Sequence, residues 1–292
     1  MEQSGSPPNV NILKHDCNNR SPVRHFPGTP PAAQGLGVPA MPDLTLWIAE
    51  GEPPFPALSR EERLLEEAAS APLLYLYRFG RRAVVLGYAQ DAEEADLEAC
   101  RRMGLPVLRR LTGGTGVLHE ESLSLSLGLP AGHPLAAGVH GLYGSFVAVV
   151  EGVLSSLGLP VRRWRPDDGS PRRRSPLCFE DHRGETLLLD GRKVLGCAQT
   201  RRRFAVLVHG VLPLSLDPEA AAAVFRLDPA RVRAAMAPLP LPAGLTPPAL
   251  GERLAGAFGA LLEADLRPCP PPPLSPALEA RRQDRRWVIL DG

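Results

Sequence analysis

The sequence predicts an α+β fold in which a largely antiparallel sheet is flanked by helices. Two observations support this prediction. Several apolar runs of strand length follow one another along the chain across short turns, which is typical of antiparallel neighbours. Stretches with helical apolar periodicity and capping residues lie between and after these runs. With 292 residues, of which 44% are hydrophobic, the chain can bury one substantial core.

The first half of the ordered chain alternates strand and helix patterns. Its expected elements are a strand at 44–49, a helix from a Ser59–Glu62 capping box to about residue 70, paired strands at 73–79 and 83–88 joined across Gly80, a helix between residues 91 and 104, and strands at 107–111 and 122–129. The last of these runs alternates polar and apolar residues with a period of two. We therefore expect a half-buried strand there.

The second half begins with an apolar helical stripe and continues with a hairpin. Its expected elements are a helix at 142–157, a hairpin at 185–200 turned at Asp190-Gly191, one or two strands at 204–216, and helices from 217 to the proline block at 268–273. These patterns divide the chain into three parts. We expect a disordered tail at 1–42, a catalytic domain at 43–266, and a proline-rich linker with a C-terminal tail at 267–292.

Composition excludes several classes of protein. The formal net charge is +1, so the whole molecule is not suited to bulk binding of nucleic acid or anionic membranes. The five cysteines are an odd number at irregular spacing without a CxxC pair, which argues against both a disulfide framework and a zinc site. The longest charge-free window, 122–150, is interrupted by glycine and proline, and no basic-then-apolar leader opens the chain. We expect a soluble cytoplasmic protein.

A glycine-containing turn, RRLTGGTGVLHE at 109–120, is the first candidate site. Glycine lets backbone amides approach a ligand closely, so such a turn can hold an anion or a carbonyl oxygen. Side chains alternate along a strand, so only one of the two arginines can point at the site. The candidate substrate-binding residues here are Arg109, Arg110, Thr112, Gly113, Gly114, Thr115 and Gly116.

A lysine marks the second candidate, LCFEDHRGETLLLDGRKVLGCAQTRRRFAVLVHG at 177–210. The chain has 33 lysines and arginines, and only Lys14 and Lys193 are lysines. Lys14 lies in the expected tail, so the ordered part of the chain uses lysine once. Where arginine is the usual cation, a single lysine suggests a need for a compact ammonium group. The alternative is a solvated lysine in a hairpin.

Together, the two motifs resemble the biotin/lipoate protein ligase superfamily, and within it the cysteine-type octanoyltransferases of lipoate assembly. The resemblance extends over about 44–265 and implies an α+β catalytic domain with a mixed sheet. It also implies an activity: transfer of a medium-chain acyl group from acyl carrier protein to one lysine of a lipoyl-acceptor domain, of the glycine cleavage H protein or 2-oxoacid dehydrogenase E2 type. This branch of the superfamily needs no cofactor, and we expect a monomer.

The resemblance also assigns residues. Cys178 matches the nucleophile of the transferase branch, and Lys193 matches the lysine that contacts the acyl carbonyl. Gly196 and Gln199, in the same motif as Lys193, are expected at the substrate, and His209 falls on a family position. A thiolate can accept an acyl group from a thioester and pass it to an amine. The incoming amine needs a base, for which His119 and His209 are candidates, with a slight preference for His119.

Two alternatives stay open. An ATP-dependent lipoate-protein ligase on the same fold would use ATP and Mg, with Arg109 and Lys193 at the adenylate phosphate. A non-catalytic acyl- or carrier-binding protein is suggested by Thr115, Val208 and Val211, which depart from the usual residues of relatives. The arginines at 162, 163, 165 and 172–174 are either a solvated loop or a docking site for an acidic carrier protein.

Overall fold

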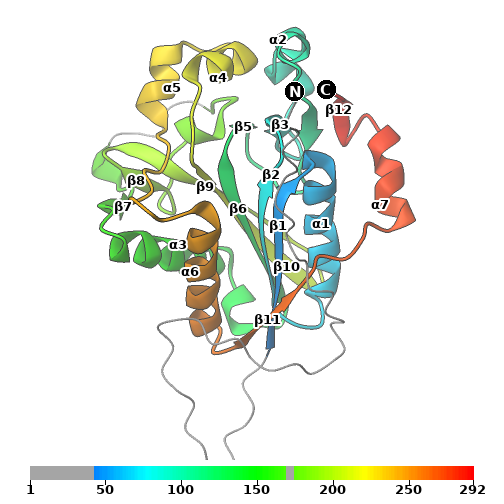
Figure 1. Cartoon of the computed structure of the whole chain (residues 1–292), viewed down its shortest axis with the longest axis vertical. Coiled ribbons are helices and arrows are strands. Elements are labelled where there is room, and N and C mark those ends of the chain that lie inside the picture. Colours follow the sequence, from blue (N-terminus) through cyan, green and yellow to red (C-terminus); the bar gives the residue numbers. More distant parts are fainter. Residues whose placement is uncertain (1–42, 169–173) are drawn as a thin grey trace, which may run out of the picture.

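The computed structural model describes residues 43–168 and 174–292 (Figure 1). Two sheets organise the chain. The larger has the strand order β11-β1-β2-β6-β10-β9-β8-β7, and the smaller has the order β12-β4-β3-β5. Strand β1 pairs in parallel with β2 and with β11, and β3 pairs in parallel with β4, whereas the other neighbours are antiparallel. The expectation of a mixed, largely antiparallel sheet is confirmed.

The strands of the large sheet come from the whole length of the described chain. They are β1 Asp43–Glu52, β2 Leu73–Phe79, β6 Ser122–Pro130, β7 Val161–Arg163, β8 Leu187–Leu189, β9 Arg192–Arg201, β10 Ala205–Pro213 and β11 Asp265–Cys269. Asp190 and Gly191 join β8 to β9 with φ values of 50° and 77°. The expected hairpin with positive φ at both turn residues is therefore confirmed.

The small sheet contains β3 Ala83–Leu86, β4 Val107–Arg109, β5 Val117–His119 and β12 Val288–Leu290. The expectation that β2 and β3 pair with each other is wrong, because the chain changes sheets between them. At that crossing Gly80 donates its N–H to the carbonyl of Glu52, and a Cβ on Gly80 would lie 2.4 Å from the carbonyl oxygen of Gly51. The glycine permits a crossing of two backbones, not a hairpin turn.

Helices cover both faces of the large sheet (Figure 1). Helices α3 Val139–Ser156 and α6 Pro247–Leu261 pack on one face, and α1 Pro54–Glu67 packs on the other. The shorter helices are α2 Leu97–Arg102, α4 Pro218–Phe225, α5 Pro229–Ala235 and α7 Pro276–Ala280. Helix α1 begins five residues before the predicted Ser59 cap, because Pro54 occupies its first position, where a missing N–H costs nothing. The predicted capping box is wrong.

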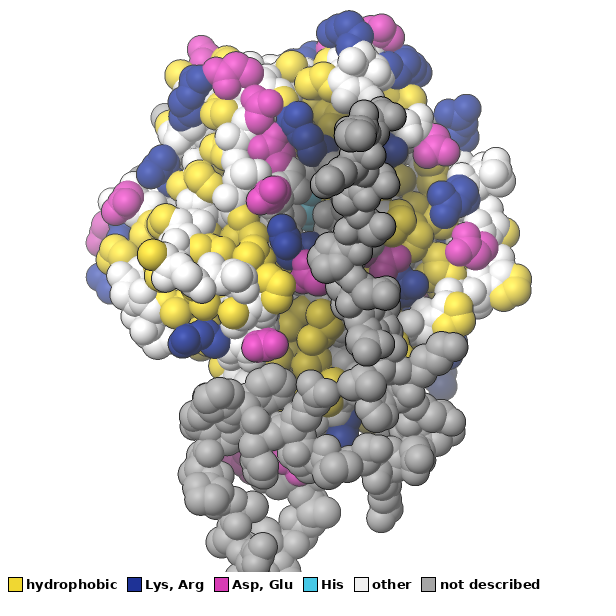
Figure 2. Space-filling model, viewed as in Figure 1, with side chains coloured by type: hydrophobic (Ala, Val, Ile, Leu, Met, Phe, Trp, Pro, Cys, Tyr) yellow, Lys and Arg dark blue, Asp and Glu magenta, His cyan; other side chains and the backbone are white. Residues whose placement is uncertain are grey.

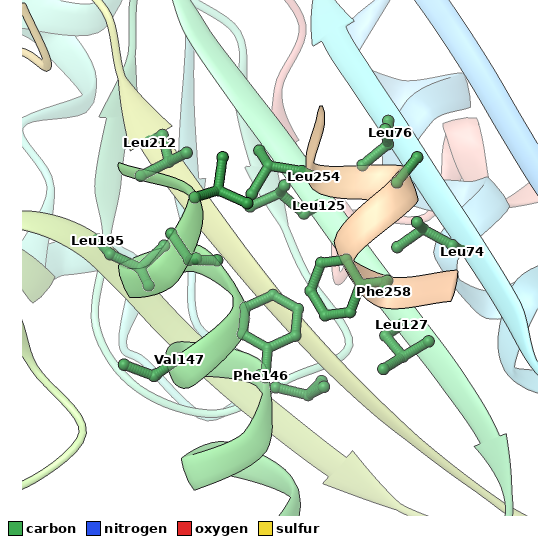
Figure 3. Packing of buried hydrophobic residues seen from close by; sticks show 14 of the residues in the cluster. Leu74, Leu76, Leu125, Leu127, Phe146, Val147, Leu195, Leu212, Leu254 and Phe258 are labelled. Atoms are coloured by element: carbon green, nitrogen blue, oxygen red, sulfur yellow. The ribbon is translucent and has the colours of Figure 1, made fainter. Parts of the chain in front are cut away.

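Strand β6 has no solvent-facing side. Leu123, Leu125 and Leu127 belong to the main core with Phe146 of α3 and Phe258 of α6, whose ring centroids are 5.3 Å apart (Figure 3). The intervening serines, Ser122, Ser124 and Ser126, are also buried. The alternation correctly predicts a strand, but the expectation of a half-buried strand is wrong. A polar, buried layer lies between β6 and α1.

Helix α3 is long and apolar enough, by length and composition, to cross a membrane. Its buried residues Leu142, Phe146 and Val150 pack in the main core against leucines of β6 and against α6. The core helix of a soluble protein has the same composition, so this helix is weak support for a membrane span.

The C-terminal residues are part of the fold. Strand β11 crosses the predicted domain boundary at residue 266 and pairs with β1, and β12 pairs with β4. The predicted linker and tail at 267–292 therefore needs correction, since strands of both sheets lie in it. The tail expected at 1–42 lies outside the described residues.

Candidate active site

A cleft lies where α1, the glycine turn and strands of both sheets meet. It brings together the two motifs that the sequence singles out. Its lining residues are Leu58, Tyr77, Val85, Arg110, Val117, His119, Ser124, Cys178, Gly196, Cys197, Ala198, His209, Gly210 and Val211.

Cys178 is fixed to the glycine turn by backbone hydrogen bonds. The N–H of Cys178 donates to the carbonyl of Gly116 at 2.8 Å, and the N–H of Gly116 donates to the carbonyl of Pro176 at 2.9 Å. Cys178 begins a short 3₁₀ turn, Cys178–Glu180, in which Phe179 is fully buried and anchors the loop. The thiol of Cys178 is thereby held at the cleft, next to the turn that the sequence predicts as a backbone donor.

Lys193 points at Cys178 from strand β9. Its Nζ donates to the carbonyls of Cys178 at 2.9 Å and of Asp181 at 2.8 Å, and lies 4.0 Å from the Sγ of Cys178. Lys193 is 6% exposed, so the alternative of a solvated hairpin lysine is wrong. An ammonium group has three donors. Two hold the loop at Cys178 and Asp181, and the third can face the sulfur.

Arg110 faces the cleft and holds the glycine turn closed. Its Nε donates to Oγ1 of Thr112 at 2.9 Å, and its Nη2 donates to the carbonyls of Gly113 at 2.6 Å and Thr115 at 3.0 Å. Burial lowers the pKa of Arg110 below its ordinary value, although Cys178 and Glu61 act in the opposite direction. Gly114 has φ of +88°, a conformation that favours glycine.

Arg109 lies on the other side of the strand, as the alternation requires. Its Nη1 donates to the backbone carbonyls of Gly87 at 2.7 Å and Gln90 at 2.6 Å, and it does not line the cleft. The expectation that Arg109 contacts substrate is therefore corrected. In the structure, the Arg109 side chain links the backbone at 87–90 to the backbone of Arg286 through hydrogen bonds.

His209 is paired with a buried carboxylate. Nδ1 of His209 lies 2.9 Å from Oε1 of Glu61, and Nε2 lies 2.9 Å from Oγ1 of Thr112. Glu61 is fully buried and also accepts hydrogen bonds from Ser126 at 2.6 Å and Tyr77 at 3.0 Å. Burial acts to raise the pKa of Glu61, but His209 and the two hydroxyls hold it below its ordinary value. The carboxylate is charged and can stabilise a protonated His209.

These contacts also assign the tautomer of neutral His209. Nδ1 carries the proton, because its partner there is the carboxylate of Glu61, which accepts. The hydroxyl of Thr112 accepts from Arg110, so it is free to donate to Nε2 of His209. Nε2 is then the basic nitrogen of the ring.

His119 is placed differently, although it lines the same cleft. Burial lowers its pKa to about 3, with further lowering by Arg110 and His209. Its Nδ1 lies 3.1 Å from Oγ of Ser122, and its ring is 4.8 Å from that of Phe79. A histidine that stays neutral at pH 7 and resists protonation is a poor base. The slight preference for His119 over His209 is therefore corrected.

The remaining predicted residues divide into two groups. Gly196 lines the cleft, whereas Gln199 does not, and its Oε1 is buried without a hydrogen-bond partner in the described part of the chain. Thr115 is buried, and its Oγ1 likewise has no partner there. Of the two positions that depart from relatives on β10, Val211 lines the cleft and Val208 lies in the main core.

The sequence reasoning missed Glu61 and the hydroxyls around it. A signal was available, since Glu61 lies on the apolar face of α1, three residues from both Leu58 and Leu64, which are buried. A carboxylate on an apolar helical stripe needs a buried partner. Among residues 43–168 and 174–292, no group of three or more His, Cys, Asp or Glu side chains could hold a metal ion.

A thiol and a histidine line one cleft of this α+β fold, with an ammonium group beside the thiol and a carboxylate beside the histidine, and groups of these types can carry acyl transfer. Residues 53–253 match the family described as "Lipoyl protein ligase A/B catalytic domain", and the chain belongs to this family.

Curated relatives carry the name Octanoyltransferase LipM. That of Kyrpidia tusciae is 34% identical over 214 residues, covering 66% of this chain and 77% of the relative. That of Geobacillus kaustophilus is 33% identical over 195 residues, covering 62% and 69%. The family, the fold class and the octanoyltransferase class expected from the sequence are confirmed.

Solved structures show the same fold. A lipoate-protein ligase A bound with ATP superposes with a TM-score of 0.65 at 22% identity, over 84% of this chain and 94% of that one. A putative lipoate protein ligase of T. acidophilum with bound lipoic acid gives a TM-score of 0.64 at 21% identity, over 83% and 94%.

Proposed function

We propose that this chain moves an octanoyl group from acyl carrier protein to one lysine of a lipoyl-acceptor domain through an acyl-Cys178 intermediate. The observation that carries the proposal is the position of Lys193, whose buried Nζ lies 4.0 Å from Sγ of Cys178 and 2.9 Å from its carbonyl. The name shared by the curated relatives supports the octanoyl group.

The first half of the reaction transfers the acyl group to the protein. The thiolate of Cys178 attacks the carbonyl carbon of the carrier thioester, and a carbon–sulfur bond forms while the bond to the carrier sulfur breaks. The carrier sulfur leaves as a thiolate and takes a proton from solvent. The ammonium group of Lys193 stabilises the thiolate before attack and the oxyanion during it, a role worth about 3–4 kcal/mol in acyl-transfer sites.

The second half transfers the acyl group to the acceptor. The amine of the acceptor lysine attacks the acyl-Cys178 carbonyl, an amide forms, and the thiol of Cys178 is released. An amine of ordinary pKa about 10.4 must lose a proton for this step. Nε2 of His209 can take that proton through the hydroxyl of Thr112, which passes its own proton to Nε2 as it accepts one from the amine, and the carboxylate of Glu61 stabilises the resulting imidazolium.

The ligase alternative receives less support. It places Arg109 at an adenylate phosphate, yet the guanidinium of Arg109 is occupied by backbone carbonyls of Gly87, Tyr88 and Gln90. The curated relatives carry the name of a transferase. We therefore propose a reaction without ATP, Mg or another cofactor. The non-catalytic alternative does not explain why a buried ammonium group faces a thiol in the cleft.

For partners, the family supports action on lipoyl domains, and one solved neighbour is titled as a lipoate protein ligase with its E2 lipoyl domain. We propose acyl carrier protein as donor, an E2 or glycine cleavage H type domain as acceptor, a monomeric enzyme and a cytoplasmic location. Basic and acidic side chains are interspersed on the face in Figure 2. Arg162, Arg163 and Arg174 form ion pairs with Asp168, Glu151 and Glu94.

These ion pairs partly neutralise the loop that the sequence suggests for carrier docking. Arg172 and Arg173 lie outside the described residues. Docking at this loop stays a prediction, and neutralising residues 172–174 should raise the carrier KM and reduce its salt dependence. An unchanged KM at low salt would exclude it.

The test is a nucleotide-free transfer assay. Octanoyl carrier protein and an unmodified lipoyl domain are incubated with enzyme, and intact masses are followed. The proposal expects an octanoyl adduct on Cys178 and then on the acceptor lysine, and no adduct with Cys178→Ala. Product that requires ATP and free octanoate would support the ligase, and absence of both products would support a binding protein.

A further inference from the structure

The C-terminal segment, residues 286–290, lies outside the part of the chain that matches the family, 53–253, and yet it contacts the site. Its strand β12 pairs with β4, with Val288 opposite Leu108. Leu290 belongs to the same apolar cluster as Leu177 and Phe179, which flank Cys178. The segment therefore shares an apolar cluster with the loop of the nucleophile, and its backbone pairs with β4, which ends at Arg109.

Arg109 connects this segment to the loop at 87–90. Its N–H donates to the carbonyl of Trp287 at 2.9 Å, and its Nε donates to the carbonyl of Arg286 at 3.0 Å. Its Nη1 donates to the carbonyls of Gly87 and Gln90 at 2.7 and 2.6 Å. One side chain thus satisfies carbonyls of two segments that lie about 200 residues apart. The lowered pKa of this arginine, which burial and then Arg286 cause, does not remove its charge at neutral pH.

Gln90 continues the connection to the nucleophile. It is 2% exposed, and its Nε2 donates to the carbonyl of Pro176 at 3.0 Å, two residues before Cys178. Its Oε1 accepts the N–H of Gly87 at 3.2 Å. Pro176 also accepts the N–H of Gly116, so Gln90 and the glycine turn hold the same carbonyl.

The loop at 87–90 also touches the glycine turn directly. The N–H of Tyr88 donates to the carbonyl of Thr112 at 2.8 Å. A Cβ on Gly87 would lie only 2.0 Å from the carbonyl oxygen of Gly114, so the two backbones are in closest contact there. A shift of the loop would be passed on to the turn and to Cys178.

We propose that Arg109 and Gln90 are positioning residues, through which the C-terminal segment fixes the loop of Cys178 relative to Lys193. The inference rests on the proposed function in that the sulfur it positions is the nucleophile. Because a displacement of about 1 Å can cost about 100-fold in rate, loss of one of these contacts should reduce turnover with little effect on donor binding.

The test uses Gln90→Leu and Arg109→Gln in the full chain. Arg282→Gln is the matched control, since Arg282 contacts Glu279 and the ring of Phe55 and lies off this path. Three quantities are measured for each protein: the rate of octanoyl-Cys178 formation in a single turnover, the donor KM, and the rate of alkylation of Cys178 by iodoacetamide between pH 6 and 9. Melting temperatures verify that each variant is folded. If Arg109→Gln does not fold, the result for Gln90→Leu decides the test.

The expected result is about tenfold slower octanoyl-Cys178 formation in both variants, with donor KM within about twofold of wild type. The alkylation profile should move to higher pH, since the sulfur leaves its place beside Lys193, and a purely structural defect would not produce this shift. A folded Gln90→Leu with wild-type rates and profile overturns the inference. If the wild-type enzyme forms no octanoyl adduct, the proposed function is wrong. The alkylation profiles of the variants still test whether Gln90 and Arg109 position Cys178.

Discussion

Nδ1 of His209 lies 2.9 Å from Oε1 of Glu61, and this contact joins strand β10 to helix α1 across 148 residues of sequence. Because Glu61 is fully buried and its pKa is held below the ordinary value, its carboxylate accepts at Nδ1 and sets the tautomer of His209. In the proposed reaction the pair provides a base for the acceptor amine, in the way that a buried carboxylate supports a catalytic histidine.

Glu61→Gln should slow the second half of the reaction. The substitution keeps the size of the side chain but removes the charge that stabilises imidazolium. We expect transfer from acyl-Cys178 to the acceptor to fall by about 100-fold, within the range of general-base contributions, while acyl-Cys178 formation changes much less. Rapid-quench measurement of each half-reaction checks this. Equal slowing of both halves would contradict the assignment of His209 as the base for the amine.

The two histidines should respond differently to substitution. His209→Gln removes the proposed base and should reduce transfer by about 100-fold or more. His119→Gln should retain the rate within about fivefold, because a group with pKa about 3 binds a proton too weakly at pH 7 to act as the base. Steady-state rates of the two variants at pH 7 separate them. The reverse order of sensitivity would restore His119 as the base.

Burial of His119 also predicts a pH dependence of stability. Its pKa falls from 6.5 to about 3 on folding, so between these values the unfolded chain binds a proton that the folded protein does not. Stability therefore decreases as pH falls below 6.5, by up to about 1.4 kcal/mol per pH unit from this group. Glu61, with a lowered pKa, adds to the loss only below about its ordinary value of 4.5.

Urea unfolding between pH 5 and 6.5 isolates the histidine contribution. His119→Phe keeps an aromatic ring beside Phe79 and should flatten the slope of stability against pH in this window. An unchanged slope would show that another group is responsible.

The cysteines should differ in reactivity. Burial raises the pKa of the Cys197 thiol to about 12 and that of Cys100 to about 11, so both stay protonated near neutral pH. Cys178, with Lys193 beside it, should be alkylated by iodoacetamide at pH 7 at least about tenfold faster than either. Peptide mass spectrometry over time measures the order. Modification of Cys197 before Cys178 would contradict the prediction, although both thiols line the cleft.

Lys193 should not be replaceable by arginine. Its Nζ serves two carbonyls and a sulfur from one point, whereas a guanidinium group is planar and larger. Lys193→Arg and Lys193→Met should both reduce acyl-Cys178 formation by about 100- to 1,000-fold, the usual range for loss of an oxyanion donor. Arg192→Lys, at the neighbouring position on the strand, is the control and should retain activity. Substantial activity in Lys193→Arg would mean that charge alone suffices.

Much of the fold follows from local patterns. The Asp190-Gly191 hairpin and the apolar stripe of α3 are found where the sequence places them, since both depend on residues close together in the chain. The assignment of β2 and β3 to different sheets was not predictable in this way, because it depends on the contact of Gly80 with the distant backbone at Gly51. Nor could the sequence show what covers the serines of β6.

The site was predicted in part for the same reason. The motifs indicate Cys178, Lys193 and the glycine turn as candidates, and the structure brings them to one cleft. The pKa of His119 and the pairing of Glu61 with His209 depend on burial between elements far apart in sequence. Arg109 and Arg110 are adjacent, and only the fold shows which of them faces the cleft.

The contact of Gly87 with Gly114 has a consequence for anyone who recombines this enzyme with its relatives. Position 87 admits no methyl group against the backbone carbonyl oxygen of residue 114, so the two backbone segments form a compatibility unit although 27 positions separate them. A chimera with its junction inside that interval would combine the two halves of the unit from different parents. A recombination library should therefore take residues 87–114 from a single parent.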